Sequence, residues 1–199
     1  KSAKQKRNTI NLWCKIVVAC LPAAVIGLLF DDILDKYLYN YVVVALMLII
    51  YGVFFILIEK RNEHTRPQVT KLTELTYQMA LIIGGFQVLA LIPGTSRSGA
   101  TILGALLIGT SRYVATEFTF YLAIPVMFGA SILKVIKFGF HYTAIEVVIL
   151  LVGCLVAFFV SVFAIKFLMG YIKKHDFKAF GYYRIVLGVL VLLYFLIFG

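Results

Sequence analysis

The segment QVLALIPGTSRSGATILGALLIG, residues 87–109, decides how this sequence folds. Within it, residues 91–102 hold one proline, two glycines, four hydroxyl side chains and Arg97. The apolar pieces on either side, residues 77–92 and 100–108, are short. At about 1.5 Å of rise per residue, the second piece covers about half of a hydrocarbon core of about 30 Å. It therefore cannot cross a membrane alone.

The rest of the chain has the composition of a helical integral membrane protein. Of the 199 residues, 62% are hydrophobic and 14% are charged. A soluble domain of this size cannot bury so much apolar surface, and the long aliphatic runs lack the alternation of a membrane β-barrel. We predict an all-α membrane protein with five full spans, at about residues 10–30, 41–58, 113–134, 144–168 and 180–198.

Charge predicts how the broken segment lies. The net charge of +10 comes mostly from basic residues in the loops, which disfavours a nucleic-acid partner. If residues 77–109 enter and leave on one side, the basic clusters at 1–7, 60–71, 112 and 173–178 share the cytoplasmic face, as the positive-inside rule requires. If the segment crosses once, the last cluster moves to the opposite face. We therefore predict a re-entrant helix–loop–helix over residues 77–109, inside one polytopic domain that covers residues 1–199.

The linker of residues 59–75 is the most polar stretch between two predicted spans. The spacing of Val69, Leu72 and Leu75 predicts a short interfacial helix there. Such a helix would lie along the cytoplasmic surface, just before the broken segment begins.

The polar run has the residue types of a phosphate-binding loop. Arg97 at mid-membrane costs at least about 2.5–3.5 kcal/mol, which a bound anion would offset. Gly94 and Gly99 allow successive backbone N–H groups to face a ligand. We expect a half-helix to start near Ser98, so that its positive end points into the loop. Further hydroxyl donors are Thr95, Ser96 and Thr101.

Two other interpretations of this loop are weaker. A helix-breaking loop with a snorkelling arginine is disfavoured by the short apolar segments on both sides of Arg97. The pattern G-x-x-x-x-G-A-T from Gly94 to Thr101 is similar to a nucleotide-binding P-loop, which needs a lysine at the position of Ala100 and a preceding strand. Both are missing from the pattern, so we predict an anion site without nucleotide chemistry.

The segment at 87–109, together with SRYVATEFTFYLAIPVMFGA at 111–130, resembles the bacterial undecaprenyl-diphosphate phosphatase family, also known for bacitracin resistance. The resemblance extends over essentially the whole chain. It implies a hydrolase of the bacterial cytoplasmic membrane that converts the C55 lipid diphosphate to its monophosphate, which recycles the carrier for cell-wall synthesis. It also implies a catalytic Arg97 with Ser96 and Ser98. The residues that would bind substrate phosphate are Gly94, Thr95, Gly99 and Thr101, and Gln87 and Glu117 would support the site.

The sequence departs from the family in one respect. The family has an earlier loop, related to this one by an inverted repeat, with a Glu-x-x-x-Glu pattern and a proline-x-serine-serine-threonine-glycine-histidine run. Neither occurs in these 199 residues. The resemblance is therefore to the family without its N-terminal part, and we expect a truncated chain that holds half of the inverted-repeat architecture. The general acid, general base and nucleophile are expected in the other half.

Several alternatives remain open from the sequence. Broken re-entrant helices also occur in transporters, so a carrier or flippase for a lipid phosphate or another anion is the second hypothesis. An anion channel built on a pore loop is the third. Two adjacent phosphates suit Mg²⁺ or Ca²⁺, although no cation ligand can be named in this sequence. The expected partners are a polyprenyl diphosphate lipid and membrane lipids, and a homo-oligomer is left open.

Overall fold

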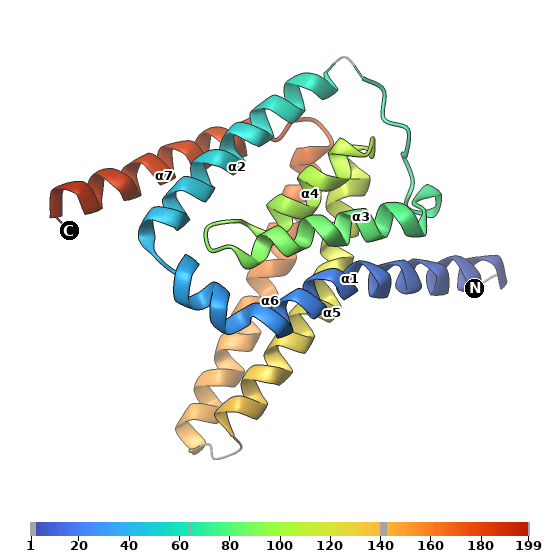
Figure 1. Cartoon of the computed structure of the whole chain (residues 1–199). Coiled ribbons are helices and arrows are strands. Elements are labelled where there is room, and N and C mark those ends of the chain that lie inside the picture. The colour runs from blue at the N-terminus through green and yellow to red at the C-terminus, as the bar shows by residue number, and fades with distance from the viewer. Residues whose placement is uncertain (1–2, 64, 140–142, 199) are drawn as a thin grey trace.

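The structure is a computed structural model that describes residues 3–63, 65–139 and 143–198 (Figure 1). Within these ranges all regular elements are helices, which confirms the predicted all-α class. Five helices are long and apolar enough to cross a membrane, as predicted. The elements are α1 (Ala3–Leu38), α2 (Tyr41–Asn62), η1 (Leu72–Glu74), α3 (Tyr77–Val88), η2 (Leu89–Leu91), α4 (Arg97–Leu107), α5 (Arg112–Phe138), α6 (Ala144–Ile172) and α7 (Lys178–Phe198).

The long helices extend beyond the predicted spans. Helix α1 continues through Pro22 and past the predicted end at Phe30 as far as Leu38. The chain then turns, and Asn40 caps α2 because its side chain accepts a hydrogen bond of 2.9 Å from the backbone N–H of Val43. Apolar side chains are exposed along most of α6. Exposed apolar surface on this scale is what a lipid-facing helix requires.

Helices α2 and α7 form the most extensive helix pair and lie side by side in Figure 1. Glycines face each other where the two helices meet. A Cβ atom on Gly52 would lie 2.7 Å from the carbonyl oxygen of Gly181, and a Cβ on Gly181 would lie 2.7 Å from the carbonyl oxygen of Gly52. Small residues at membrane helix contacts let the backbones approach closely. The α2–α7 pair is therefore closely packed.

The two short helices α3 and α4 pack against each other as a hairpin, with the polar loop at its turn (Figure 1). Helix α1 packs on α3, while α2 and α5 pack on α4. The predicted pair of short helices, broken at the proline and glycine, is thus confirmed. Its re-entrant placement in the membrane stays a prediction.

The linker before α3 contains less helix than predicted. In place of an interfacial helix it has the single 3₁₀ turn η1. The linker is held instead by backbone pairing with the turn between α4 and α5: the N–H of Gln68 donates to the carbonyl oxygen of Gly109, and the N–H of Ser111 donates to that of Val69, each at 2.8 Å. Val69 and Leu75 are buried against the core, which explains their apolar spacing.

Candidate phosphate-binding site

The loop between α3 and α4 turns sharply at Gly94. The backbone N–H of Thr95 donates to the carbonyl oxygen of Ile92 at 3.1 Å. Gly94 has φ = +86°, in the left-handed region that favours glycine. A Cβ atom at Gly94 would also overlap the backbone of Val44 on α2. Both the turn and the close contact with α2 therefore require glycine at this position.

Helix α4 begins at this loop, with Ser96 as its N-cap. The Ser96 hydroxyl accepts a hydrogen bond of 3.2 Å from the N–H of Gly99 and lies 3.1 Å from the hydroxyl of Ser98. The first intrahelical bond of α4 runs from Ala100 N–H to the Ser96 carbonyl, so the amides of Arg97 and Ser98 precede it and can face a ligand. The helix starts at Arg97, one residue before the position we predicted, and its positive end points into the loop.

The guanidinium of Arg97 has no anionic partner among the side chains that the structure describes. Its Nη1 atom is buried without a hydrogen-bond partner among the described residues, and none of the described carboxylates forms an ion pair with it. Leaving a buried donor unpaired costs about 1–3 kcal/mol, and more for a charged group. Arg97 therefore has the properties of a counter-ion for a bound anion.

Arg97 and Gln87 line the same cavity, which has a volume of about 430 Å³. The Gln87 side chain is 2% exposed, and neither its Oε1 nor its Nε2 has a hydrogen-bond partner among the described residues. The walls are mostly small and apolar. They include Ala23, Ala24 and Gly27 of α1, and Gly129 and Ala130 of α5. An amphiphile with an anionic head group fits a cavity of this character.

Three other predicted site residues, Thr95, Thr101 and Glu117, are not among the residues that line the Arg97 cavity. Thr95 is buried in the loop. Thr101 is fully buried behind it, where its hydroxyl lies 3.1 Å from the carbonyl oxygen of Arg97 and accepts a hydrogen bond of 3.0 Å from Thr119 on α5. Thr101 thus joins α4 to α5. Glu117 is half-buried on α5 and is not among the residues that line the Arg97 cavity.

The structure adds Arg184, which the sequence analysis missed. Its Nη2 donates a hydrogen bond of 2.7 Å to the carbonyl oxygen of Gly94, and its guanidinium carbon lies 5.8 Å from the centroid of the Tyr51 ring. Arg184 lies in α7, inside the last predicted span. An ionisable residue inside a span was the available signal, because such residues mark functional sites.

Comparison with known proteins identifies the family. The family model described as Bacitracin resistance protein BacA matches residues 1–190. The chain belongs to this family. It is 63% identical to the undecaprenyl-diphosphatase of Acetivibrio thermocellus over 191 residues, which covers 96% of this chain and 70% of that protein. It is 59% identical to the undecaprenyl-diphosphatase of Enterococcus faecalis strain V583 over 199 residues, covering 98% and 72%.

The described side chains do not provide a complete set of ligands for the predicted divalent cation. Among the side chains that the structure describes, no group of three or more from His, Cys, Asp or Glu is placed to hold a metal ion. The Arg97 cavity is lined by no carboxylate among the described residues. The described side chains around Arg97 therefore do not by themselves fit a bound cation, and no reaction step is assigned to one.

Proposed function

We propose that this protein is an undecaprenyl-diphosphatase, which hydrolyses undecaprenyl diphosphate to undecaprenyl phosphate and inorganic phosphate. The observation that carries the proposal is the Nη1 atom of Arg97 at the start of α4, which is buried and has no hydrogen-bond partner among the described residues, beside an apolar cavity that Arg97 lines. The names of relatives about 60% identical support hydrolysis over the transport alternative. The reaction would recycle the lipid carrier for peptidoglycan synthesis in the bacterial cytoplasmic membrane, and its family gives resistance to bacitracin.

Substrate binding follows from the arrangement of donors around the loop. The diphosphate would accept hydrogen bonds from Arg97 and from the first amides of α4, where the helix dipole also favours negative charge. Gln87 supplies both a donor and an acceptor in the same cavity. The apolar walls suit the first isoprene units of the lipid, while the remainder of the tail stays in the bilayer.

The chemical step needs stabilisation of negative charge on the terminal phosphate oxygens and on the bridging oxygen. A side chain of the earlier loop, or a water that this loop activates, attacks the terminal phosphorus. The bond from that phosphorus to the bridging oxygen breaks, so that negative charge grows on the bridging oxygen. If a side chain is the nucleophile, water then hydrolyses the phosphorylated side chain and releases inorganic phosphate. Arg97 and the loop amides would stabilise charge on the terminal oxygens, because donors that the fold already holds in place need no reorientation during the reaction. The proton transfers belong to the carboxylates and histidine that the family resemblance assigns to its earlier loop.

Three finer parts of the proposal concern conditions and assembly. The two phosphates of the substrate suit a divalent cation, Mg²⁺ or Ca²⁺, which the substrate itself would help to bind. A homo-oligomer is compatible with the large exposed apolar surface of α6. The plasma membrane is the expected location because the five apolar helices need a bilayer and the carrier lipid is used there.

The decisive experiment measures phosphate release from undecaprenyl diphosphate by the purified full-length protein, with wild type compared to Arg97→Ala and Arg97→Lys. Removing a preorganised donor for transition-state charge costs about 10²–10³-fold in turnover. We expect a loss of at least that size for Arg97→Ala and a smaller loss for Arg97→Lys. The matched control is Arg61→Ala, which replaces an exposed arginine in the last turn of α2 and should keep wild-type turnover. Near wild-type turnover by Arg97→Ala would refute the proposal, and lipid movement between leaflets without phosphate release would favour transport.

A further inference from the structure

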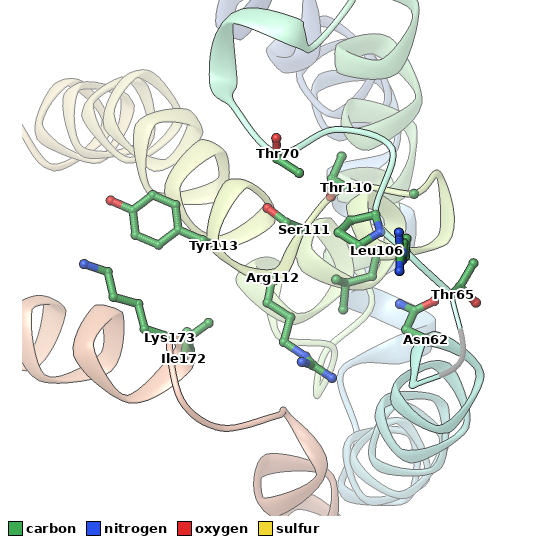
Figure 2. A pocket seen from close by; sticks show the side chains of 13 residues that line it. Asn62, Thr65, Thr70, Leu106, Thr110, Ser111, Arg112, Tyr113, Ile172 and Lys173 are labelled. Carbon is green, nitrogen blue, oxygen red and sulfur yellow. The ribbon is translucent and has the colours of Figure 1, made fainter.

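A second pocket lies at the helix ends that the charge pattern assigns to the cytoplasm (Figure 2). It has a volume of about 520 Å³ and shares no lining residue with the Arg97 cavity. The end of α2, the turn between α4 and α5 and the end of α6 surround it. Arg97 and Leu106 lie near opposite ends of α4, so about 14 Å of helix separates the two sites.

The lining of this pocket is basic. Arg66, Arg112 and Lys173 contribute to it, and its described lining includes no acidic side chain. Arg112 is already neutralised, since its Nε donates to both carboxylate oxygens of Glu59, at 3.0 and 2.9 Å. Arg66 and Lys173 form no ion pair among the described residues. The pocket therefore has an excess of positive charge, of which the described fold uses Lys173 only in a cation–π contact, 5.4 Å from the centroid of the Tyr113 ring.

Helix α5 also begins at this pocket. Ser111 is its N-cap, and the Ser111 hydroxyl accepts a hydrogen bond of 3.3 Å from the N–H of Val114. The first amides of α5, at Arg112 and Tyr113, belong to residues that line the pocket. A helix of 27 residues has a full dipole, so its start favours an anion.

Thr110 gives an independent indication of a ligand. Its side chain is 3% exposed and lines the pocket, and its hydroxyl oxygen has no hydrogen-bond partner in the described structure. Its backbone N–H is satisfied, because it donates to the carbonyl oxygen of Ala105 at 3.2 Å. Buried hydroxyls are nearly always paired in folded proteins. The Thr110 hydroxyl thus fits a partner that enters the pocket beside the start of α5.

We propose that this pocket binds a phosphate group, held by Arg66, Lys173, the Thr110 hydroxyl and the first amides of α5. A phosphate has several oxygens with which to accept from cations, a hydroxyl and amides at once, which a single carboxylate does less well. The same chemistry is offered by inorganic phosphate and by the head group of an anionic phospholipid. This site is separate from the diphosphatase chemistry, so its test does not depend on turnover.

The first arm of the test measures binding of radiolabelled inorganic phosphate to full-length protein in phosphatidylcholine nanodiscs. All variants carry Arg97→Gln, which removes the hairpin site and leaves the proposed one. We expect one remaining site. Arg66→Gln with Lys173→Gln should lower its affinity at least about tenfold, since the variant removes hydrogen bonds from charged groups to the phosphate. The matched control is Arg61→Gln with Lys174→Gln, two exposed neighbours outside the lining, which should leave the affinity within about twofold.

A second variant separates the pocket from general surface charge. Thr110→Val keeps the shape and the net charge and removes only the unpaired hydroxyl, so the fold should be unaffected or slightly more stable. We expect weaker phosphate binding with an unchanged or higher melting temperature. Binding by Thr110→Val and by the double variant that equals the Arg97→Gln parent would overturn the proposal.

The second arm identifies the source of the phosphate group. Phosphatidic acid is added to the nanodiscs, and its retention by the Arg97→Gln protein and its competition with inorganic phosphate are measured. Competition that disappears in the Arg66→Gln, Lys173→Gln variant assigns the site to a lipid head group. Phosphate binding without competition assigns it to the free anion. If the Arg97→Gln protein binds neither ligand, the proposal is wrong.

Discussion

The guanidinium of Arg184 donates a hydrogen bond of 2.7 Å to the carbonyl oxygen of Gly94, which ties α7 to the phosphate-binding loop. Gly94 also rests on the backbone of Val44, and α2 is packed firmly on α7. The loop is therefore held from one side by the α2–α7 pair, while Arg97 faces the cavity between α1 and α5. Arg184 acts through the loop backbone, so we regard it as a positioning residue.

Arg184→Ala should lower kcat/KM for phosphate release by about 10–100-fold, because a hydrogen bond from a charged group is worth about 1.5–3 kcal/mol and each 1.4 kcal/mol is tenfold. Arg184→Lys should recover part of the loss, since an ammonium group can also donate to Gly94. The control is Lys178→Ala, which removes a cation at the start of the same helix that pairs with Glu63. It should lower the free energy of unfolding by less than about 1 kcal/mol and leave kcat/KM nearly unchanged. Equal kcat/KM for the two alanine variants would show that the loop does not depend on Arg184.

Gly94→Ala should destabilise the protein and reduce activity together. The positive φ alone costs a non-glycine residue about 1–2 kcal/mol, and the added methyl group would overlap the α2 backbone. The control is Gly85→Ala on α3, where a Cβ meets no atom within 4 Å and alanine favours the helix. Thermal unfolding in detergent should show a lower midpoint for Gly94→Ala only. An unchanged midpoint would mean that the loop can move away from Val44.

Local chemistry made the hairpin predictable from sequence. Pro93 and Gly94 stop one helix, Ser96 caps the next, and the short apolar pieces limit their length, so the break and the start of α4 follow from neighbouring residues. The contact between Arg184 and Gly94 joins positions 90 residues apart. Such a contact has no periodic pattern, because it depends on how α7 packs. The 3₁₀ turn η1 was also missed as such, since burial of Val69 and Leu75 produces the same apolar spacing as a helix.

The ion pair of Glu59 with Arg112 joins α2 to the start of α5. Of the charged contacts, it should be the one whose loss lowers the free energy of unfolding most. Glu59 is fully buried and also accepts a hydrogen bond of 3.2 Å from the backbone N–H of Phe177. Glu59→Ala should destabilise the protein by about 1–3 kcal/mol, because it leaves the Phe177 N–H without its acceptor and the partly exposed Arg112 without its counter-ion. Glu63→Ala, at the exposed pair with Lys178, should cost about 1 kcal/mol or less.

A double variant separates the pair from the general packing of α2. Glu59→Ala with Arg112→Ala removes both charges, so it should be less destabilised than the sum of the two single variants. Unfolding midpoints in detergent for the four proteins of this cycle would measure the coupling. Strict additivity would show that Glu59 stabilises the fold through Phe177 alone.

Replacing Gln87 by leucine should raise the stability of the protein and lower its activity. Its amide is buried with both polar atoms unpaired among the described residues, so Gln87→Leu removes a desolvation cost and should raise the free energy of unfolding by about 1–3 kcal/mol. If Gln87 pairs with the diphosphate beside Arg97, the same change should lower kcat/KM by about tenfold or more. The control is Gln78→Leu, an exposed glutamine on the same helix that should leave kcat/KM unchanged. A Gln87→Leu protein that is more stable and fully active would remove Gln87 from the site, whereas a less stable protein would show that its amide has a partner in the folded protein.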